Sequence, residues 1–347
     1  MTRVVPFLVV AMAVTPLTLP AIAADIGGQG YSGGYQNFFG NSDDLRSGFS
    51  QDFDNSDAYD PLTFELGLRY WYSWGAQKFT VGPSSVSEND NTNSAEAYFR
   101  VDDHSTGFYA KGIGGVDFAI NGSAADQFGD SASITDGHVA YAGADLGYSW
   151  LGDPRSGMSF GPFAGYMYWN DSPNMGRANY TVGTQTSDFS YNGNVVGPGD
   201  SQENNIEINA LRLGFSGKAN LGTYFDVNGE LAAVPYANLS GVLGAFGVPN
   251  QASGSDVLIQ SSAVSTDGWG YGAMGELMFG YHPTSNLTFR LGGRAWYLQG
   301  QTQNSYNTIA VSNDSSHTVA GQQRYVYSSD PWSLFRYGLL TEMTYNF

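Results

Sequence analysis

The sequence contains no cysteine and few charged residues, and both absences narrow its class. Without cysteine the chain has no disulfide framework and no thiolate metal site. Charged residues make up 13% of the 347 residues, against roughly 25% in ordinary soluble domains. The 14 Lys and Arg residues are outnumbered by 32 Asp and Glu residues. This acidic balance disfavours nucleic acid as a partner, because phosphate backbones attract basic surfaces.

Long apolar runs are also missing beyond the N-terminus. No later segment approaches the roughly 20 consecutive apolar residues that a membrane-spanning helix needs. Intrinsic disorder is excluded by the abundance of aromatic residues, with 23 Tyr, 21 Phe and 7 Trp. An ordered chain of low charge and high aromatic content remains, and its apolar residues must be arranged in a pattern other than a helical span.

The N-terminus has the features of an export signal. Arg3 precedes a mostly apolar stretch over 4–19, and the small residues of 21–24 fit a cleavage site. The alternative is a membrane anchor, but the apolar stretch is short and ends at Pro20. We therefore expect three regions: a cleaved signal peptide over 1–24, a flexible Gly- and Asp-rich extension over 25–61, and one folded domain over 62–347.

From residue 62 the apolar residues recur with a period of two. In 64–74 the even positions are apolar or aromatic, and in 335–347 the odd positions are, except for Thr341. Successive side chains of a strand point to opposite faces, so both segments predict strands with one apolar face. Eight further strands are predicted at 94–102, 108–120, 138–150, 158–170, 206–217, 223–236, 268–281 and 286–299. The predicted total is ten strands. Eight or twelve strands remain possible, because it is ambiguous which side chains of 158–170 and 206–217 face the lumen.

The connections between these strands alternate in length. Short turns at 102–107, 151–157, 217–223 and 282–286 alternate with long segments at 77–93, 121–137, 171–205, 237–267 and 300–332. Aromatic residues such as Trp74, Tyr166, Trp169 and Trp269 lie near strand ends, where membrane barrels carry aromatic belts. The sequence therefore predicts an all-β fold, a transmembrane antiparallel β-barrel with short periplasmic turns and long extracellular loops.

The C-terminal segment carries a resemblance. Residues 343–347 (Met-Thr-Tyr-Asn-Phe) resemble the β-signal of bacterial outer-membrane proteins, which the barrel-assembly machinery recognises. Segments 107–112, 211–215 and 292–297 are similar to those of an alphaproteobacterial outer-membrane β-barrel family. These resemblances imply an outer-membrane location. They also imply that the assembly machinery would read an apolar row made of Phe335, Tyr337, Leu339, Met343, Tyr345 and Phe347.

The polar face of the predicted strands should line the lumen. It carries acidic and basic residues in nearly equal numbers, whereas a wide pore would be expected to carry an excess of one sign. Because an unpaired buried charge costs several kcal/mol, we expect these residues to pair and fill a narrow barrel. A narrow channel stays open as the alternative. The predicted ionic network comprises Glu65, Arg69, Glu96, Arg100, Lys111, Asp117, Asp145, Arg212, Asp226, Glu230, Glu276, Arg290, Arg294, Arg336 and Glu342.

Catalytic motifs are weak. His104 and His282 lie in short turns, which leaves His138 and His317 as candidates. A strand count of ten is similar to that of the omptin proteases, and the Asp136–His138 spacing resembles half of their site. The matching Asp-x-Asp is missing, because Asp52 and Asp54 lie in the extension. No Gly-x-Ser-x-Gly is present. We therefore expect no catalytic residues and no enzyme. An omptin-like outer-membrane hydrolase stays open as the second alternative, after the narrow channel.

The predicted loops are acidic and could bind Ca²⁺ or Mg²⁺ weakly, since these ions prefer carboxylate oxygens. The candidate ligands are Asp126, Asp130, Asp136, Asp188, Asp200 and Glu203. No cofactor is expected, and whether a metal is held remains unknown from the sequence. The expected partners are outer-membrane lipid, lipopolysaccharide and the assembly machinery, with no nucleic acid. The sequence thus favours a structural or surface-interaction role in the cell envelope, with a narrow porin as the alternative.

Overall fold

The computed structural model describes residues 61–127, 131–153, 157–174, 188–191, 194–198, 203–244, 248, 251–312 and 319–347. Residues 61–127 and the later described segments belong to one compact unit. The predicted signal peptide and all but the last residue of the predicted extension lie outside the described residues. In the described part, no helix is both long and apolar enough to span a membrane.

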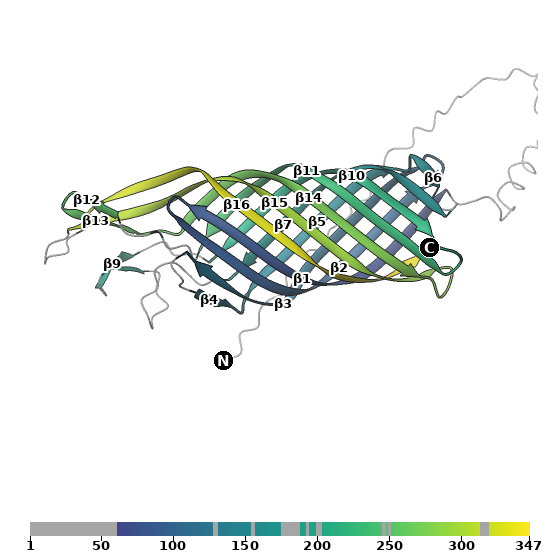
Figure 1. Ribbon diagram of the computed structural model, residues 1–347, viewed down its shortest axis with the longest axis horizontal. Coiled ribbons are helices and arrows are strands. Elements are labelled where there is room, and N and C mark those ends of the chain that lie inside the picture. The colour runs from purple at the N-terminus through teal and green to yellow at the C-terminus, as the bar shows by residue number, and fades with distance from the viewer. Residues whose placement is uncertain are drawn as a thin grey trace, which may run out of the picture. The chain divides into compact units, whose positions relative to one another are not determined.

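Long antiparallel strands follow one another around a closed ring (Figure 1). Each strand pairs with the next member of the ring, and the last one returns to pair with the first. Within the described residues the ring holds ten strands, as the alternating pattern predicts. They are β1 (Leu62–Val81), β2 (Ser84–Asp103), β3 (Phe108–Asp126), β5 (Gly137–Tyr148), β7 (Met158–Pro173), β10 (Asn205–Asn220), β11 (Phe225–Leu243), β14 (Val264–Tyr281), β15 (Leu287–Ser312) and β16 (Val319–Asn346).

Short strands pair with some of the ring strands near their ends. β4 (Ser131–Ile134) pairs with β3, and β6 (Leu151–Asp153) pairs with β7. β12 (Gln251–Ser253) and β13 (Asp256–Gln260) extend the sheet beyond β15. β8 (Asp188–Tyr191) and β9 (Asn194–Pro198) form a separate pair. We call the end with the short connections, such as 104–107 and 282–286, the turn end, and the opposite end the hairpin end.

Two of the segments predicted as long loops continue as strands. β1 and β2 remain paired to their tips, where only Gly82 and Pro83 connect them, and Gly82 adopts a positive φ of 54°. β15 and β16 likewise stay paired over most of 300–332. The prediction was wrong for 77–93 and for most of 300–332. The outer face of these strand ends is largely polar, whereas the inner face mixes polar side chains with apolar ones such as Phe79 and Trp332, so apolar and polar residues no longer alternate regularly. Their ladder rests on backbone hydrogen bonds, which need no apolar alternation.

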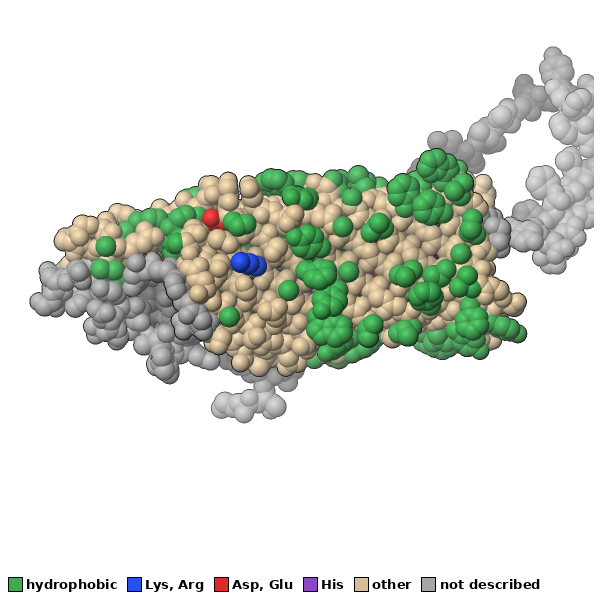
Figure 2. Space-filling model, viewed as in Figure 1, with side chains coloured by type: hydrophobic (Ala, Val, Ile, Leu, Met, Phe, Trp, Pro, Cys, Tyr) green, Lys and Arg blue, Asp and Glu red, His purple; other side chains and the backbone are tan. Residues whose placement is uncertain are grey.

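The outer surface of the barrel is apolar and its period of two matches the sequence. On β1 Leu66 is 53% exposed and Leu68 is 65% exposed, whereas Arg69 points to the opposite face and is buried. Figure 2 shows hydrophobic side chains gathered toward the turn end, with a more polar surface beyond them toward the hairpin end. The side chains of the predicted assembly row are all exposed on this outer surface: Phe335, Tyr337, Leu339, Met343, Tyr345 and Phe347.

One member of the predicted aromatic belt faces the other way. Tyr166 is 50% exposed on the outer surface, but Trp169 is fully buried inside the barrel. The two residues are separated by an odd number of positions on β7, so they must point to opposite faces. Placing Trp169 in the belt was therefore wrong, and its actual position means that the lumen contains aromatic side chains.

Candidate functional site

The lumen near the turn end is filled by charged side chains that face one another across several strands. Arg290 on β15 lies 2.6 Å from Glu65, 3.1 Å from Asp226 and 2.5 Å from Glu342. Arg69 on β1 also contacts Glu342, so this carboxylate is shared between two guanidinium groups. The side chains of Arg290 and Glu342 are almost fully buried. This arrangement satisfies ions that would otherwise be strongly destabilising in a dry interior.

The same network continues toward the middle of the barrel through Arg294. Its guanidinium lies 2.6 Å from Glu96 and 2.7 Å from Glu276. Arg69 reaches the same two carboxylates, at 3.1 Å and 3.4 Å. Strand register explains the pairing, because Arg69 lies directly opposite Glu96 on β2 and Arg294 directly opposite Glu276 on β14. Cross-strand neighbours on one face are within reach of ion pairing.

A second cluster lies on the neighbouring wall of the barrel. Asp145 on β5 lies 3.1 Å from both Lys111 and Arg212. Glu230 on β11 contacts Lys111 and lies 2.7 Å from Arg212. The guanidinium of Arg212 also lies 5.4 Å from the ring centre of Phe163, within the range of a cation–π contact. Two basic and two acidic side chains therefore neutralise one another locally.

Two of the predicted network residues are placed differently. Arg100 pairs with Asp102 on its own strand at 2.7 Å, close to the turn end. Asp117 accepts a hydrogen bond of 2.8 Å from the backbone N–H of Val139. Neither contacts the larger network through an ion pair within the described residues. Two further residues join the network, because His282 lies 3.0 Å and Lys218 lies 3.8 Å from Asp226.

A third charged cluster lies nearer the hairpin end, around Arg336 on β16. Its guanidinium binds Asp90 on β2 at 2.8 Å and Asp171 on β7 at 2.9 Å. Glu88 is 2% exposed, and neither of its carboxylate oxygens has a hydrogen-bond partner in the described part of the chain. Burial, together with the negative charges of Asp90 and Asp171, raises the pKa of Glu88 well above its usual range.

Sequence reasoning missed these three carboxylates because they lie in the segments predicted as loops, 77–93 and 171–205. The available signal was the spacing of Glu88 and Asp90, which continues the even-numbered inward row of β2 that includes Glu96. Arg336 was predicted to face inward, but its partners could not be identified while its neighbours were read as loop residues.

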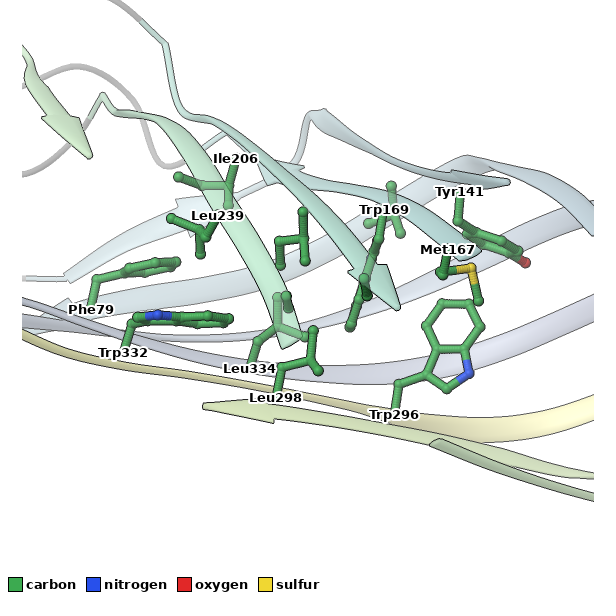
Figure 3. Packing of buried hydrophobic residues seen from close by; sticks show 14 of the residues in the cluster. Phe79, Tyr141, Met167, Trp169, Ile206, Leu239, Trp296, Leu298, Trp332 and Leu334 are labelled. Atoms are coloured by element: carbon green, nitrogen blue, oxygen red, sulfur yellow. The ribbon is translucent and has the colours of Figure 1, made fainter. Parts of the chain in front are cut away.

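Apolar side chains fill the lumen between and above these clusters. The ring of Trp296 packs against Trp71, Tyr141 and Trp169, with ring centres 4.7, 5.1 and 5.0 Å apart. Figure 3 shows several of these inward rings together with Met167. Closer to the hairpin end, the buried cluster continues through aliphatic and aromatic residues, which are Ile206, Ile208, Leu239, Leu298, Leu334, Phe79 and Trp332.

The apolar layer rests directly on the ionic network. The guanidinium of Arg294 lies 5.1 Å from the ring centre of Trp71 and 5.2 Å from that of Trp296. A small cavity of about 60 Å³ remains near the turn end, lined by residues such as Arg69, Tyr98, Lys111 and Glu230. At roughly 10–15 Å³ per water, this volume holds a few water molecules. The lumen is therefore layered, with two ionic clusters toward the turn end and an apolar section above them that surrounds the Arg336 cluster.

The candidate catalytic residues are not brought together. His138 is exposed on β5, and Asp136 accepts a hydrogen bond of 2.8 Å from the backbone N–H of Gly137. His104 lies 2.8 Å from the hydroxyl of Thr63 at the turn end. His317, Asp52 and Asp54 lie outside the described residues.

The candidate calcium ligands are only partly described. Asp126, Asp136 and Glu203 are described, and Asp188 is described in its backbone alone, whereas Asp130 and Asp200 lie outside the described residues. Within the described chain, no group of three or more acidic or histidine side chains is arranged to hold a metal ion. Divalent-cation binding by these acids therefore stays a prediction.

Comparisons with known proteins agree with the barrel geometry. No family model matches the sequence, and no curated protein matches it. The outer membrane protease OmpT from Escherichia coli is similar in structure, with a TM-score of 0.50 and 11% identity, over 83% of this chain and 97% of that one. The translocator domain of the autotransporter NalP from Neisseria meningitidis has a TM-score of 0.34 and 10% identity, over 88% and 95% of the two chains. The chain is thus a β-barrel of the outer-membrane type in its fold.

Proposed function

We propose that this protein is an integral component of a bacterial outer membrane whose barrel is closed, and that its role is structural or in surface interaction. The observation that carries this proposal is the filled lumen. Ion pairs occupy it near the turn end, and the packed rings around Trp296 occupy it above them. A barrel filled in this way holds its shape without conducting solutes.

The outer face supports insertion into lipid. Its exposed side chains are apolar from the turn end up to a belt of aromatic residues that includes Trp74, Tyr337 and Tyr271. Aromatic residues of this kind prefer the boundary between lipid and water. We assign the turn end to the periplasm and the hairpin end to the exterior, since short turns and long outer segments are typical of these barrels.

The outer segments support contact with the surroundings of the cell. The β15–β16 hairpin continues well beyond the aromatic belt (Figure 1), and β13 pairs with the end of β15, with β12 paired to β13. Its exposed faces carry polar side chains such as Gln301, Gln303 and Gln323. A long paired hairpin keeps these side chains in fixed positions, which suits a binding surface better than an unpaired loop.

Charge distribution argues against a wide pore. Each buried Arg of the lumen faces carboxylates at ion-pair distance, and the cluster of Lys111 and Arg212 is balanced by Asp145 and Glu230. An aqueous pore selective for ions would be expected to carry rings of one sign on its wall. We also propose no hydrolytic activity, since His138 is exposed and has no carboxylate within ion-pair distance in the described part of the chain.

Conductance of the refolded full chain in planar lipid bilayers tests the proposal. We expect no steady current steps from the wild-type protein in concentrated KCl, with heat-modifiable migration on gels as proof of folding. Stepwise conductance from folded wild-type protein would reject the closed barrel in favour of the narrow channel. Trp296→Ala is the matched variant, because it removes the ring that contacts three other aromatic residues.

A further inference from the structure

A groove of about 530 Å³ lies on the outer face of the barrel at the level of the aromatic belt. Four strands contribute to it, and their register aligns the key side chains in one row. Lys78 on β1 is opposite Ser333 on β16, Ser333 is opposite Gln299 on β15, and Gln299 is opposite Tyr271 on β14. Residues directly opposite one another share a face, so this row is continuous on the outside.

The shape of the groove follows from the sizes of these residues. The small side chain of Ser333 forms the floor between the larger side chains of Lys78 and Gln299. Trp269 and Tyr271 form the far wall and are 49% and 47% exposed. Gln299 donates a hydrogen bond of 3.0 Å to the hydroxyl of Tyr271. This bond fixes the amide and the phenol in place before any ligand arrives.

Lys78 differs from the basic residues that fill the lumen. It is exposed and forms no ion pair with a described residue, whereas the buried arginines of the lumen each have carboxylate partners. It lies four residues beyond Trp74 on the same face of β1, just outside the apolar surface. A positive charge at this level faces the headgroups of the outer leaflet.

We propose that this groove binds the phosphorylated sugar headgroup of an outer-leaflet glycolipid. Lys78 supplies the charge for the phosphate, Gln301 at the edge of the groove offers an amide to sugar hydroxyls, and the exposed ring of Trp269 provides an apolar face for the sugar. The occupant is a lipid rather than a soluble sugar phosphate, because the groove opens on the outer wall directly above the apolar surface. The inference rests on the outer-membrane location of the proposed function.

The test is a binding titration of the refolded full chain in detergent micelles with diphosphoryl lipid A, read out by native mass spectrometry. Lys78→Gln should weaken binding about fivefold, as expected for one partly exposed ion pair. Lys78→Arg should retain binding. The matched control is Arg324→Gln, which removes another exposed positive charge from β16 away from the groove. Heat-modifiable migration confirms that every variant is folded.

Two further titrations test whether the phosphate and the lipid part of the ligand are both needed for binding. Dephosphorylated lipid A should bind wild-type protein and Lys78→Gln equally. Free glucosamine 1-phosphate should bind much more weakly than lipid A. The proposal is overturned if Lys78→Gln binds diphosphoryl lipid A as tightly as wild type, if Arg324→Gln weakens binding equally, or if free glucosamine 1-phosphate binds as tightly as the lipid. If the proposed outer-membrane location were wrong, by contrast, the wild-type protein would be absent from outer-membrane fractions.

Discussion

Glu342 lies directly opposite an arginine on each side of β16, with Arg290 across the pair with β15 and Arg69 across the pair with β1. One carboxylate thereby links the last two strands of the chain to the first. The Nη1 of Arg290 lies 2.5 Å from its Oε1, and Arg69 donates to its Oε2. Charge-assisted hydrogen bonds of this kind are stronger than neutral ones and fix the relative positions of their strands.

Removing an arginine from this network should destabilise the barrel. Arg294→Ala leaves Glu96 without its two bonds from Arg294 and deprives Glu276 of its shortest ion pair. We expect a loss of about 3–5 kcal/mol in the free energy of unfolding, as for other broken buried pairs. Urea titration of protein refolded in lipid vesicles measures it. The exposed Arg324→Ala should change stability by less than about 0.5 kcal/mol. A loss below about 1 kcal/mol for Arg294→Ala would indicate a hydrated lumen.

The apolar layer should contribute comparably. Trp296→Ala removes a ring that is 2% exposed and leaves a cavity among Trp71, Tyr141 and Trp169. The expected cost is about 3–5 kcal/mol in the same urea titration. Trp150→Ala serves as the control, because its side chain is 66% exposed at the turn end. Equal losses for the two variants would contradict a packed aromatic layer inside the barrel.

The pH dependence of stability should reveal Glu88, which lies beyond the aromatic belt, opposite Gln77. Its pKa is raised by burial and by Asp90 and Asp171, so the folded state takes up a proton more readily than the unfolded chain. Stability therefore falls as pH rises from the unfolded pKa of about 4.3 through the folded one. Glu88→Gln should raise stability at neutral pH.

The control for Glu88 is the same pair of proteins at pH below the unfolded pKa. There Glu88 is protonated in both states, so the stabilisation by Glu88→Gln relative to wild type should disappear. Urea midpoints measured over a pH series give the difference directly. A constant difference between wild type and variant at every pH would mean that the carboxyl of Glu88 does not titrate with folding.

Assembly should depend on the terminal aromatic residue. Phe347 is 68% exposed on the outer face, and its backbone N–H donates a hydrogen bond of 2.9 Å to the carbonyl of Phe64. Phe347→Asp should reduce the amount of heat-modifiable barrel in outer-membrane fractions, because it puts a charge at the end of the apolar row. Phe347→Tyr should assemble normally. Normal levels of the Asp variant would count against recognition of this residue by the assembly machinery.

The sequence was most informative where charged residues on the inner face of a strand alternate with apolar residues on its outer face. The period of two placed Arg69, Glu96 and Arg294 on one inward face, and register then brings them together. It was least informative where both faces are polar, as around Glu88, or where inward positions are aromatic, as at Trp71. An aromatic residue suits either lipid or a packed lumen, so only its odd or even position along the strand reveals which side it faces.

The closure of the ring between β1 and β16 has a consequence for how the chain folds. Glu65 is paired with Asn346, so the contact that completes the ladder joins residues from nearly opposite ends of the folded domain. Closing so long a loop has a high entropic cost before any contact compensates for it, and such high contact order slows folding. Until β16 is synthesised, β1 has an unpaired edge. An unpaired strand edge can pair with other chains, so the partly formed barrel is exposed to aggregation until β16 closes the ring.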